Sequence, residues 1–208
     1  MLGAMAVYRD HVLPRVQDRL LGMGETREMR ARVCAGLAGD VVEVGFGSGH
    51  NLPYLPAGVT GLWAVDPSEV GRRLSQARRE RFPVPVVFSG TDGESLPFPD
   101  DRFDAALSTW TLCTIPDAVA ALRELRRVLR RDARLHFVEH GLAPDRTVAT
   151  WQHRATPLQR RLAGGCHLDR DIPALLDAGG FTVESMDTYY ERSAPKVLGH
   201  IYEGIARA

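Results

Sequence analysis

A run of β-branched residues that ends in three alternating glycines limits the folds open to this chain more than any other stretch. The valine-rich residues 41–44 lead directly into Gly45, Gly47 and Gly49. Such a run is typical of a buried strand, and closely spaced glycines indicate a tight turn after it. Glycine adopts backbone angles that other residues avoid, and it lets a ligand approach the main chain closely. The stretch therefore predicts a strand followed by a ligand-binding turn.

The spacing of an acidic residue from this turn indicates what kind of ligand binds there. Residues 61–65 are the next strand candidate and end at Asp66, about 20 positions after the first glycine. An acid at that place can bind both hydroxyls of a ribose. The glycine pattern is one residue shorter than the G-x-G-x-x-G that holds a dinucleotide pyrophosphate. It therefore favours a nucleoside without a pyrophosphate and disfavours a nicotinamide-dependent oxidoreductase.

The same residues carry a resemblance to a known family. The stretch from Glu43 to Gly49, followed by Val65, Asp66 and Pro67, resembles the S-adenosylmethionine motif of class I methyltransferases with a methyltransferase type 11 domain. The resemblance implies an α/β fold: a doubly wound, Rossmann-like, seven-stranded, mostly parallel sheet with helices on both faces and an antiparallel C-terminal strand. It implies S-adenosylmethionine as cofactor and S-adenosylhomocysteine as product. The cofactor-binding residues expected in this first part are Glu43, Gly45, Phe46, Gly47, Gly49, Asn51, Asp66 and Pro67.

Two further stretches extend the expected cofactor site. Residues 89–98 resemble the G-D-A-E-x-L-P-F element of the same superfamily with one inserted residue, which makes Asp92, Gly93 and Glu94 adenine-binding candidates. Asp92 has an alternative role in an Asx-turn. Residues 103–109 read as the fourth strand, and the end of that strand would place Ser108 and Thr109 beside the sulfonium, because ligands of doubly wound sheets bind at the carboxyl ends of strands.

The helix expected after the glycine turn begins with His50 and Asn51. Its N-terminal N–H groups suit the methionine carboxylate of the cofactor. Asn51 would either contact that carboxylate or cap the helix, and capping is the commoner use of asparagine at this position.

Candidate catalytic residues stand at the end of the fifth strand, residues 135–141. His140 is the candidate general base, because an ordinary histidine titrates near pH 6.5. Glu139 would orient His140 or turn inward as a structural partner. A pair of His136 and His140 with no third ligand apparent predicts no metal site.

Short matches in the C-terminal half resemble the methyltransferase-like thiol S-methyltransferases of animal endomembranes. The matching residues are Leu112, Cys113, Glu139, His140, Trp151, Gly165, Cys166, Leu168, Arg170, His200, Ile201 and Tyr202. The resemblance implies a small-molecule acceptor, with a thiol favoured. The animal proteins begin with a hydrophobic anchor that this sequence lacks, so their location does not transfer. The residues expected near the acceptor are Tyr8, His11, Trp110, Cys113, Trp151 and His167.

The chain divides into a helical segment, residues 1–40, and a methyltransferase domain, residues 41–208, with residues 142–172 as an acceptor-side insertion. The N-terminal helices would either pack on the domain edge or form a lid over the ligand. The remaining readings of the function are N-methylation of a phospholipid head group, O- or C-methylation of a quinone-like metabolite, and a non-catalytic S-adenosylmethionine-binding module.

Composition excludes several classes of partner and compartment. A formal net charge of zero gives no bulk electrostatic reason to bind nucleic acid. No apolar run approaches the roughly 18 residues of a membrane span. The 3 cysteines show no C-x-x-C pair, which argues against a disulfide framework or zinc site and fits a cytoplasmic location. Lys196 is the only lysine, and an arginine-rich composition of this kind hints at a GC-rich bacterial genome.

Overall fold

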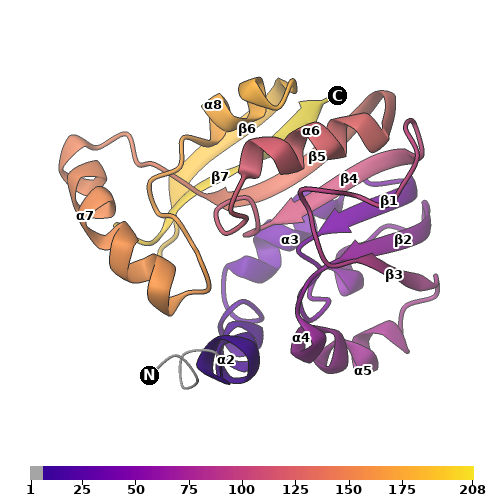
Figure 1. Cartoon of the computed structure of the whole chain (residues 1–208), viewed down its shortest axis with the longest axis horizontal. Helices are drawn as coiled ribbons and strands as arrows, with labels where there is room; N and C mark the ends of the chain where they lie inside the picture. Colours follow the sequence, from indigo (N-terminus) through magenta and orange to yellow (C-terminus); the bar gives the residue numbers. More distant parts are fainter. Residues whose placement is uncertain (1–6) are drawn as a thin grey trace.

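A single seven-stranded sheet forms the centre of the molecule, in the computed structural model that describes residues 7–208 (Figure 1). The strand order is β3-β2-β1-β4-β5-β7-β6. The strands are β1 Gly39–Val44, β2 Val59–Val65, β3 Val86–Gly90, β4 Phe103–Thr109, β5 Leu129–His140, β6 Thr182–Tyr190 and β7 His200–Arg207. Strands β1 to β5 pair in parallel, and β7 runs antiparallel to both β5 and β6. The expected fold class, including the antiparallel C-terminal pairing, is confirmed.

Helices cover both faces of the sheet, as a mostly parallel sheet requires. The helices are η1 Tyr8–Val12 (a π-helix), α2 Leu13–Leu20, α3 Thr26–Cys34, η2 Leu52–Tyr54 (3-10), α4 Glu69–Leu74, α5 Gln76–Arg79, α6 Ala118–Val128, α7 Arg146–Leu162 and α8 Ile172–Ala178. Helices α6 and α8 pack on one face, where Leu122 and Leu176 join Val42 in the larger core cluster. Helix α3 packs on the other face, where Val33 joins Val41. Successive valines of β1 thus enter opposite cores.

The order of the strands places a crevice at one end of the sheet. From β1 the chain adds β2 and β3 on one side and then crosses to β4 on the other. Val44, the last residue of β1, pairs with Val65 of β2 and Ser108 of β4. Such a reversal of strand order leaves an opening beyond the carboxyl ends of the flanking strands. The glycine turn after β1 and the loop after β4 therefore face the same space.

Two elements of the fold are locally irregular. The helical segment after Asp66 is broken at the buried Ser75 into α4 and α5, and Ser68 caps α4 by accepting a hydrogen bond from the Gly71 N–H at 3.0 Å. Strand β5 contains a bulge near its start, where Asp132 takes a positive φ of 63° and the register with β4 shifts.

Among the described residues, no helix combines the length and the apolar character needed to cross a membrane.

Candidate active site

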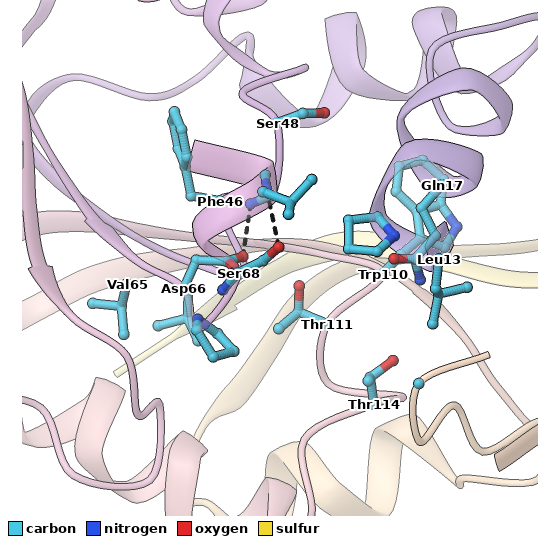
Figure 2. Close-up of a pocket in the computed structure, with 18 of the residues that line it drawn as sticks. Leu13, Gln17, Phe46, Ser48, Val65, Asp66, Ser68, Trp110, Thr111 and Thr114 are labelled. Atoms are coloured by element: carbon cyan, nitrogen blue, oxygen red, sulfur yellow. Dashed lines mark hydrogen bonds between the residues drawn. The ribbon is translucent and has the colours of Figure 1, made fainter. Parts of the chain in front are cut away.

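A cavity of about 930 Å³ lies at the carboxyl ends of β1 and β4 (Figure 2). The expected site residues that line it are Gly45, Phe46, Gly47, Asp66, Pro67, Asp92, Gly93, Glu94, Thr109, Trp110 and His11. The structure thus brings most of the expected cofactor residues together around one space. Its volume falls within the range of small-molecule and cofactor sites.

The three glycines of the turn each require a positive φ, and they differ in what surrounds them. The φ angles are 81° at Gly45, 55° at Gly47 and 77° at Gly49. A Cβ added to Gly45 would lie 1.8 Å from the Thr111 Oγ1, whereas one added to Gly47 would meet nothing nearer than the Gly45 O at 4.0 Å. Gly45 therefore allows the β1 turn to pack against the loop after β4, and Gly47 leaves its Cα side open to the cavity.

Asp66 ties the end of β2 to the glycine turn. Its Oδ2 accepts a hydrogen bond from the Gly47 N–H at 2.7 Å, and its Oδ1 accepts one from the Ser68 N–H at 2.7 Å. Burial raises the pKa of Asp66, against the opposing effect of these two bonds. Figure 2 shows Asp66 and Ser68 beside Phe46 at one wall. Each carboxylate oxygen keeps a second lone pair, so Asp66 retains the capacity to accept bonds from two hydroxyls.

The Asp92 loop forms another part of the wall. The Asp92 Oδ1 accepts a hydrogen bond from the Glu94 N–H at 2.8 Å, so the Asx-turn alternative is present. Glu94 in turn accepts a bond from the Asp117 N–H at 2.9 Å. A Cβ on Gly93 would lie 2.9 Å from the Val44 Cγ1. The loop is thus held against the end of β1, with a glycine at the closest approach.

A buried polar network lies beneath the glycine turn and corrects the expectation for Asn51. Asn51 makes no helix cap. Its Nδ2 donates to the Glu43 Oε1 at 2.7 Å and to the Thr109 Oγ1 at 3.0 Å, and its Oδ1 accepts from Arg30 at 2.5 Å. Asn51 and Glu43 are almost fully buried and do not line the cavity, since their polar atoms are directed into this network.

Arg30 is the cation of that network and reaches the cavity wall. Its side chain is 5% exposed, and burial lowers its pKa to about 10. Burial likewise raises the pKa of Glu43 to about 8. Arg30 was not predicted as a site residue, because nothing in the sequence distinguishes it from the other arginines of residues 25–37.

Trp110 occupies a strained position directly after β4. Its φ of 51° lies in the left-handed region, which a bulky side chain rarely adopts. The backbone N–H donates to the Val138 O at 2.7 Å, and the Arg30 guanidinium lies 4.7 Å from the ring centroid. The indole lines the cavity at the wall shared with Leu13 and Gln17 (Figure 2).

Glu139 turns inward as a structural partner. Of the two roles considered from the sequence, this is the one observed, and Glu139 does not orient His140. Its carboxylate is fully buried and accepts bonds from the Ser108 hydroxyl at 2.8 Å and from the N–H groups of Thr111, Leu112 and Cys113 at 3.0–3.2 Å. Ser108 does not line the cavity, because its hydroxyl is directed at Glu139. Glu139 therefore fixes the conformation of the loop after β4.

His140 also lies behind the cavity wall. Its Nδ1 is buried without a hydrogen-bond partner. One ligand atom each of His140, Cys113 and Cys166 lie within 4.8 Å of one another. His136 lies apart, with its Nδ1 2.7 Å from the Val33 O, so the two histidines form no pair. The structure thus replaces the histidine pair considered from the sequence with a different trio.

The remaining residues expected near the acceptor do not line the cavity. Tyr8 donates a hydrogen bond from its hydroxyl to the Leu162 O at 2.9 Å. Trp151 is 54% exposed, and the His167 N–H donates to the Cys113 O at 2.7 Å. The N-terminal segment instead presents other residues to the cavity: Arg9, Asp10, Leu13, Pro14, Gln17, Asp18 and Leu21. Thr111 and Thr114 also line the cavity, as do Gly164 and Gly165, which lie within the segment 142–172.

A glycine turn after β1, an acid at the end of β2 and a cavity at the reversal of strand order define a nucleoside-cofactor domain of the class I methyltransferase type. Residues 42–137 match the family described as methyltransferase domain. Residues 42–137 therefore form a methyltransferase domain, in agreement with the resemblance found in the sequence.

Two relatives and one solved structure illustrate the range of similar proteins. Thiol S-methyltransferase TMT1B of Rattus norvegicus is 28% identical over 137 residues, which is 63% of this chain and 55% of that protein. A demethylmenaquinone methyltransferase of Mycobacterium sp. (strain KMS) is 33% identical over 64% of this chain and 57% of its own length. A crystal structure of a Bacillus halodurans methyltransferase superposes with a TM-score of 0.72 at 17% identity, covering 88% of this chain and 99% of that one. The thiol methyltransferases that match are covered over 55–62% of their length.

Proposed function

We propose that the protein transfers the methyl group of S-adenosylmethionine to a small-molecule acceptor, and that the acceptor is a thiol. The observation that carries the proposal is one cavity of about 930 Å³ in which the glycine turn, Asp66 and the Asp92 loop stand opposite a second wall. When bound, the cofactor supplies an electrophilic methyl group on a sulfonium. The chain's own residues bind and orient the two reactants, which is the main requirement of such a transfer.

The cofactor wall has a place for each end of the nucleoside. Asp66 has free lone pairs for the ribose hydroxyls, and Asp92 with the Gly93 N–H stands where an adenine edge would lie. Arg30 offers a buried cation at the wall and is suited to a carboxylate. The methionine part would then extend from the glycine turn towards Trp110.

The opposite wall has an uncharged part that is suited to a small, weakly polar acceptor. This part is formed by Leu13 and Gln17 of α2, by Thr111 and Thr114 after β4, and by Gly165 after α7, while the charged Arg9, Asp10 and Asp18 also line the cavity. We infer that residues 1–40 act as a lid and residues 142–172 as the acceptor-side insertion of the domain at 41–208, because both contribute to this wall. A thiol has a pKa of about 8.5, so a useful fraction ionises near neutral pH without a strong base. The proposal gives His140 no role as a base, because its ring does not line the cavity.

The thiol preference is supported by relatives whose names state that activity, at 28–29% identity. A quinone-like acceptor is the second candidate, because relatives at 32–33% identity are named demethylmenaquinone methyltransferases. Both groups are named methyltransferases, so the chemistry of the acceptor is what distinguishes them.

The test is methyl transfer from isotopically labelled S-adenosylmethionine, read by mass spectrometry. The panel contains an aliphatic thiol, a phenol, a quinol and an ethanolamine phospholipid, with Asp66→Ala as the matched control. A labelled thioether that disappears with Asp66→Ala supports the proposal. Label on the quinol or the phospholipid overturns the thiol assignment and keeps the enzyme class. Tight binding of S-adenosylhomocysteine without any product from the panel speaks for the non-catalytic binding module.

A further inference from the structure

We propose that Cys113, His140 and Cys166 form a binding site for a thiophilic divalent cation, with Zn²⁺ as the representative ion. The three residues come from different parts of the chain: the loop after β4, the end of β5 and the segment after α7. One ligand atom from each lies within 4.8 Å of the other two. The site is separate from the cofactor wall and does not depend on which acceptor is methylated.

The distance between the sulfurs fits a shared metal ion. The Cys113 Sγ and the Cys166 Sγ are 3.8 Å apart. Two thiolates that each lie about 2.3 Å from a tetrahedral zinc ion are separated by roughly 3.7–3.8 Å. A disulfide would need the sulfurs at about 2.05 Å. The two side chains therefore have the spacing of metal ligands without any rearrangement.

The third residue, His140, has a buried ring nitrogen without a hydrogen-bond partner within residues 7–208. Among the described residues, the His140 Nδ1 has no hydrogen-bond partner although it is shielded from solvent. Buried polar atoms without a partner are uncommon, because each loses its hydrogen bond to water without a replacement. Neutral imidazole is a common ligand of zinc. A metal ion bound to the imidazole of His140 would account for a histidine placed beside two thiols.

The charge of the group suits its surroundings. Cys113 is 1% exposed and Cys166 is 6% exposed, and both pack with Leu168 in a small apolar cluster. Two thiolates and one neutral imidazole balance the two positive charges of the ion, so no net charge is buried. The guanidinium of the nearby Arg170 donates hydrogen bonds to the backbone oxygens of Leu112 and Pro116. These bonds leave the two thiols available for a metal ion.

The donor set selects among metals and leaves one position open. Thiolate and imidazole ligands favour Zn²⁺ over Mg²⁺ and Ca²⁺, which prefer oxygen. Within residues 7–208, no fourth His, Cys, Asp or Glu joins the group. Three protein ligands and an open fourth position are typical of zinc sites that also bind water or a small molecule.

The position of the group links it to the acceptor wall. Thr114 follows Cys113, Gly165 precedes Cys166, and both neighbours line the cavity. The His167 N–H already donates to the Cys113 O at 2.7 Å. A bound ion would therefore fasten the segment after α7 to the loop after β4 and hold this wall in place.

The experiment is a titration of the reduced, metal-stripped whole protein with Co²⁺, followed by displacement with Zn²⁺. We expect one equivalent to bind with the ultraviolet charge-transfer absorption of cobalt thiolates, and Zn²⁺ to abolish that absorption. Cys113→Ser and Cys166→Ser should each lose most of the charge-transfer band, and His140→Ala should weaken binding at least tenfold. Cys34→Ser is the matched control, because Cys34 is equally buried but lies in the other core cluster.

The titration of the wild-type protein decides the question even if a variant fails to fold, which circular dichroism would reveal. Absence of a charge-transfer band in the reduced wild-type protein overturns the proposal. So does a band that persists in folded Cys113→Ser and Cys166→Ser and is lost in Cys34→Ser. A Cys113–Cys166 disulfide found by mass spectrometry, together with no metal binding after its reduction, would assign the pair to redox chemistry instead.

Discussion

The two walls of the cavity are built in different ways. The cofactor wall depends on short stretches of sequence. These are three glycines with positive φ within five residues, and Asp66, which accepts a hydrogen bond from the Gly47 N–H. The acceptor wall depends on contacts between residues far apart in the chain, such as Tyr8 with the Leu162 O and Cys113 with Cys166. Local backbone geometry thus defines the first wall, and tertiary packing defines the second.

Two buried acids, Glu139 and Glu43, also differ between the two walls, in the number of hydrogen bonds that they accept. Glu139, beside the acceptor wall, accepts four hydrogen bonds and holds a loop. Glu43, beneath the cofactor wall, accepts one bond from Asn51 and leaves its Oε2 without a partner among the described residues. Glu139 thus holds a loop through four bonds, whereas Glu43 keeps an oxygen that is unpaired within residues 7–208, beneath the cofactor wall.

The largest effect should come from the turn itself. Gly45→Ala places a Cβ 1.8 Å from the Thr111 Oγ1 at a φ of 81°, so we expect a loss of at least about 3 kcal/mol in the free energy of unfolding. Gly24→Ala is the matched control, because Gly24 has a φ of 61° with nothing within 4 Å of its added Cβ. That variant should lose only about 1 kcal/mol. Urea unfolding measures both, and equal losses would show that backbone strain alone matters at Gly45.

Glu43 should give the stability a pH dependence. Burial raises its pKa to about 8 from an ordinary 4.5, so the folded protein holds a proton that the unfolded chain releases. This contribution to the free energy of unfolding is fully present below pH 4.5 and falls as the pH rises to about 8, by up to ~1.4 kcal/mol per pH unit. Glu43→Gln keeps an oxygen for Asn51 and should flatten the profile.

Urea unfolding over that pH range, with and without S-adenosylmethionine, measures this effect. The sulfonium and ammonium of the cofactor exceed its carboxylate by one positive charge. This net charge favours ionised Glu43, so cofactor binding should also flatten the profile of the wild-type protein. Parallel pH profiles for the wild-type protein and Glu43→Gln would mean that another group carries the dependence.

Asp66→Ala should weaken the binding of S-adenosylhomocysteine by about 1–3 kcal/mol, the scale of a hydrogen bond to a charged group. Asp92→Ala should cost less, about 1 kcal/mol, because Asp92 is exposed and water competes for its carboxylate. Titration calorimetry on the folded variants gives both numbers. An unchanged affinity in Asp66→Ala would mean that the ribose is held elsewhere, and a larger loss in Asp92→Ala would reverse the ranking of the two acids.

The contrast between the walls also explains what the sequence could predict. The strand before Gly45 and the acid at position 66 follow from propensity and spacing, which act over a few residues, so the fold and most of the cofactor wall were predicted. The role of Asn51 was predicted wrongly, because a helix cap can be inferred from neighbouring residues alone. Its actual partners, Glu43, Arg30 and Thr109, lie on three other elements.

The acceptor side was predicted poorly for the same physical reason. Cys113 and Cys166 are separated by 53 positions, and no spacing rule connects them. His140 was a candidate base because of its place at a strand end, yet it lies beside Cys113 and Cys166 and does not line the cavity. Side-chain direction in such a wall is determined by tertiary contacts, which a single sequence does not show.

The smallest effect should come from the tie between the N-terminal segment and α7. Tyr8→Phe removes one exposed hydrogen bond, from the Tyr8 hydroxyl to the Leu162 O, so the free energy of global unfolding should change by less than about 1 kcal/mol. If residues 1–40 act as a lid, the variant should raise the acceptor KM more than it lowers kcat, and amide exchange in α2 should become faster. Hydrogen-exchange mass spectrometry and acceptor kinetics measure the two effects. Unchanged exchange and an unchanged KM would place the N-terminal helices as fixed packing on the domain edge, because a lid held by this bond could not lose it without opening more often.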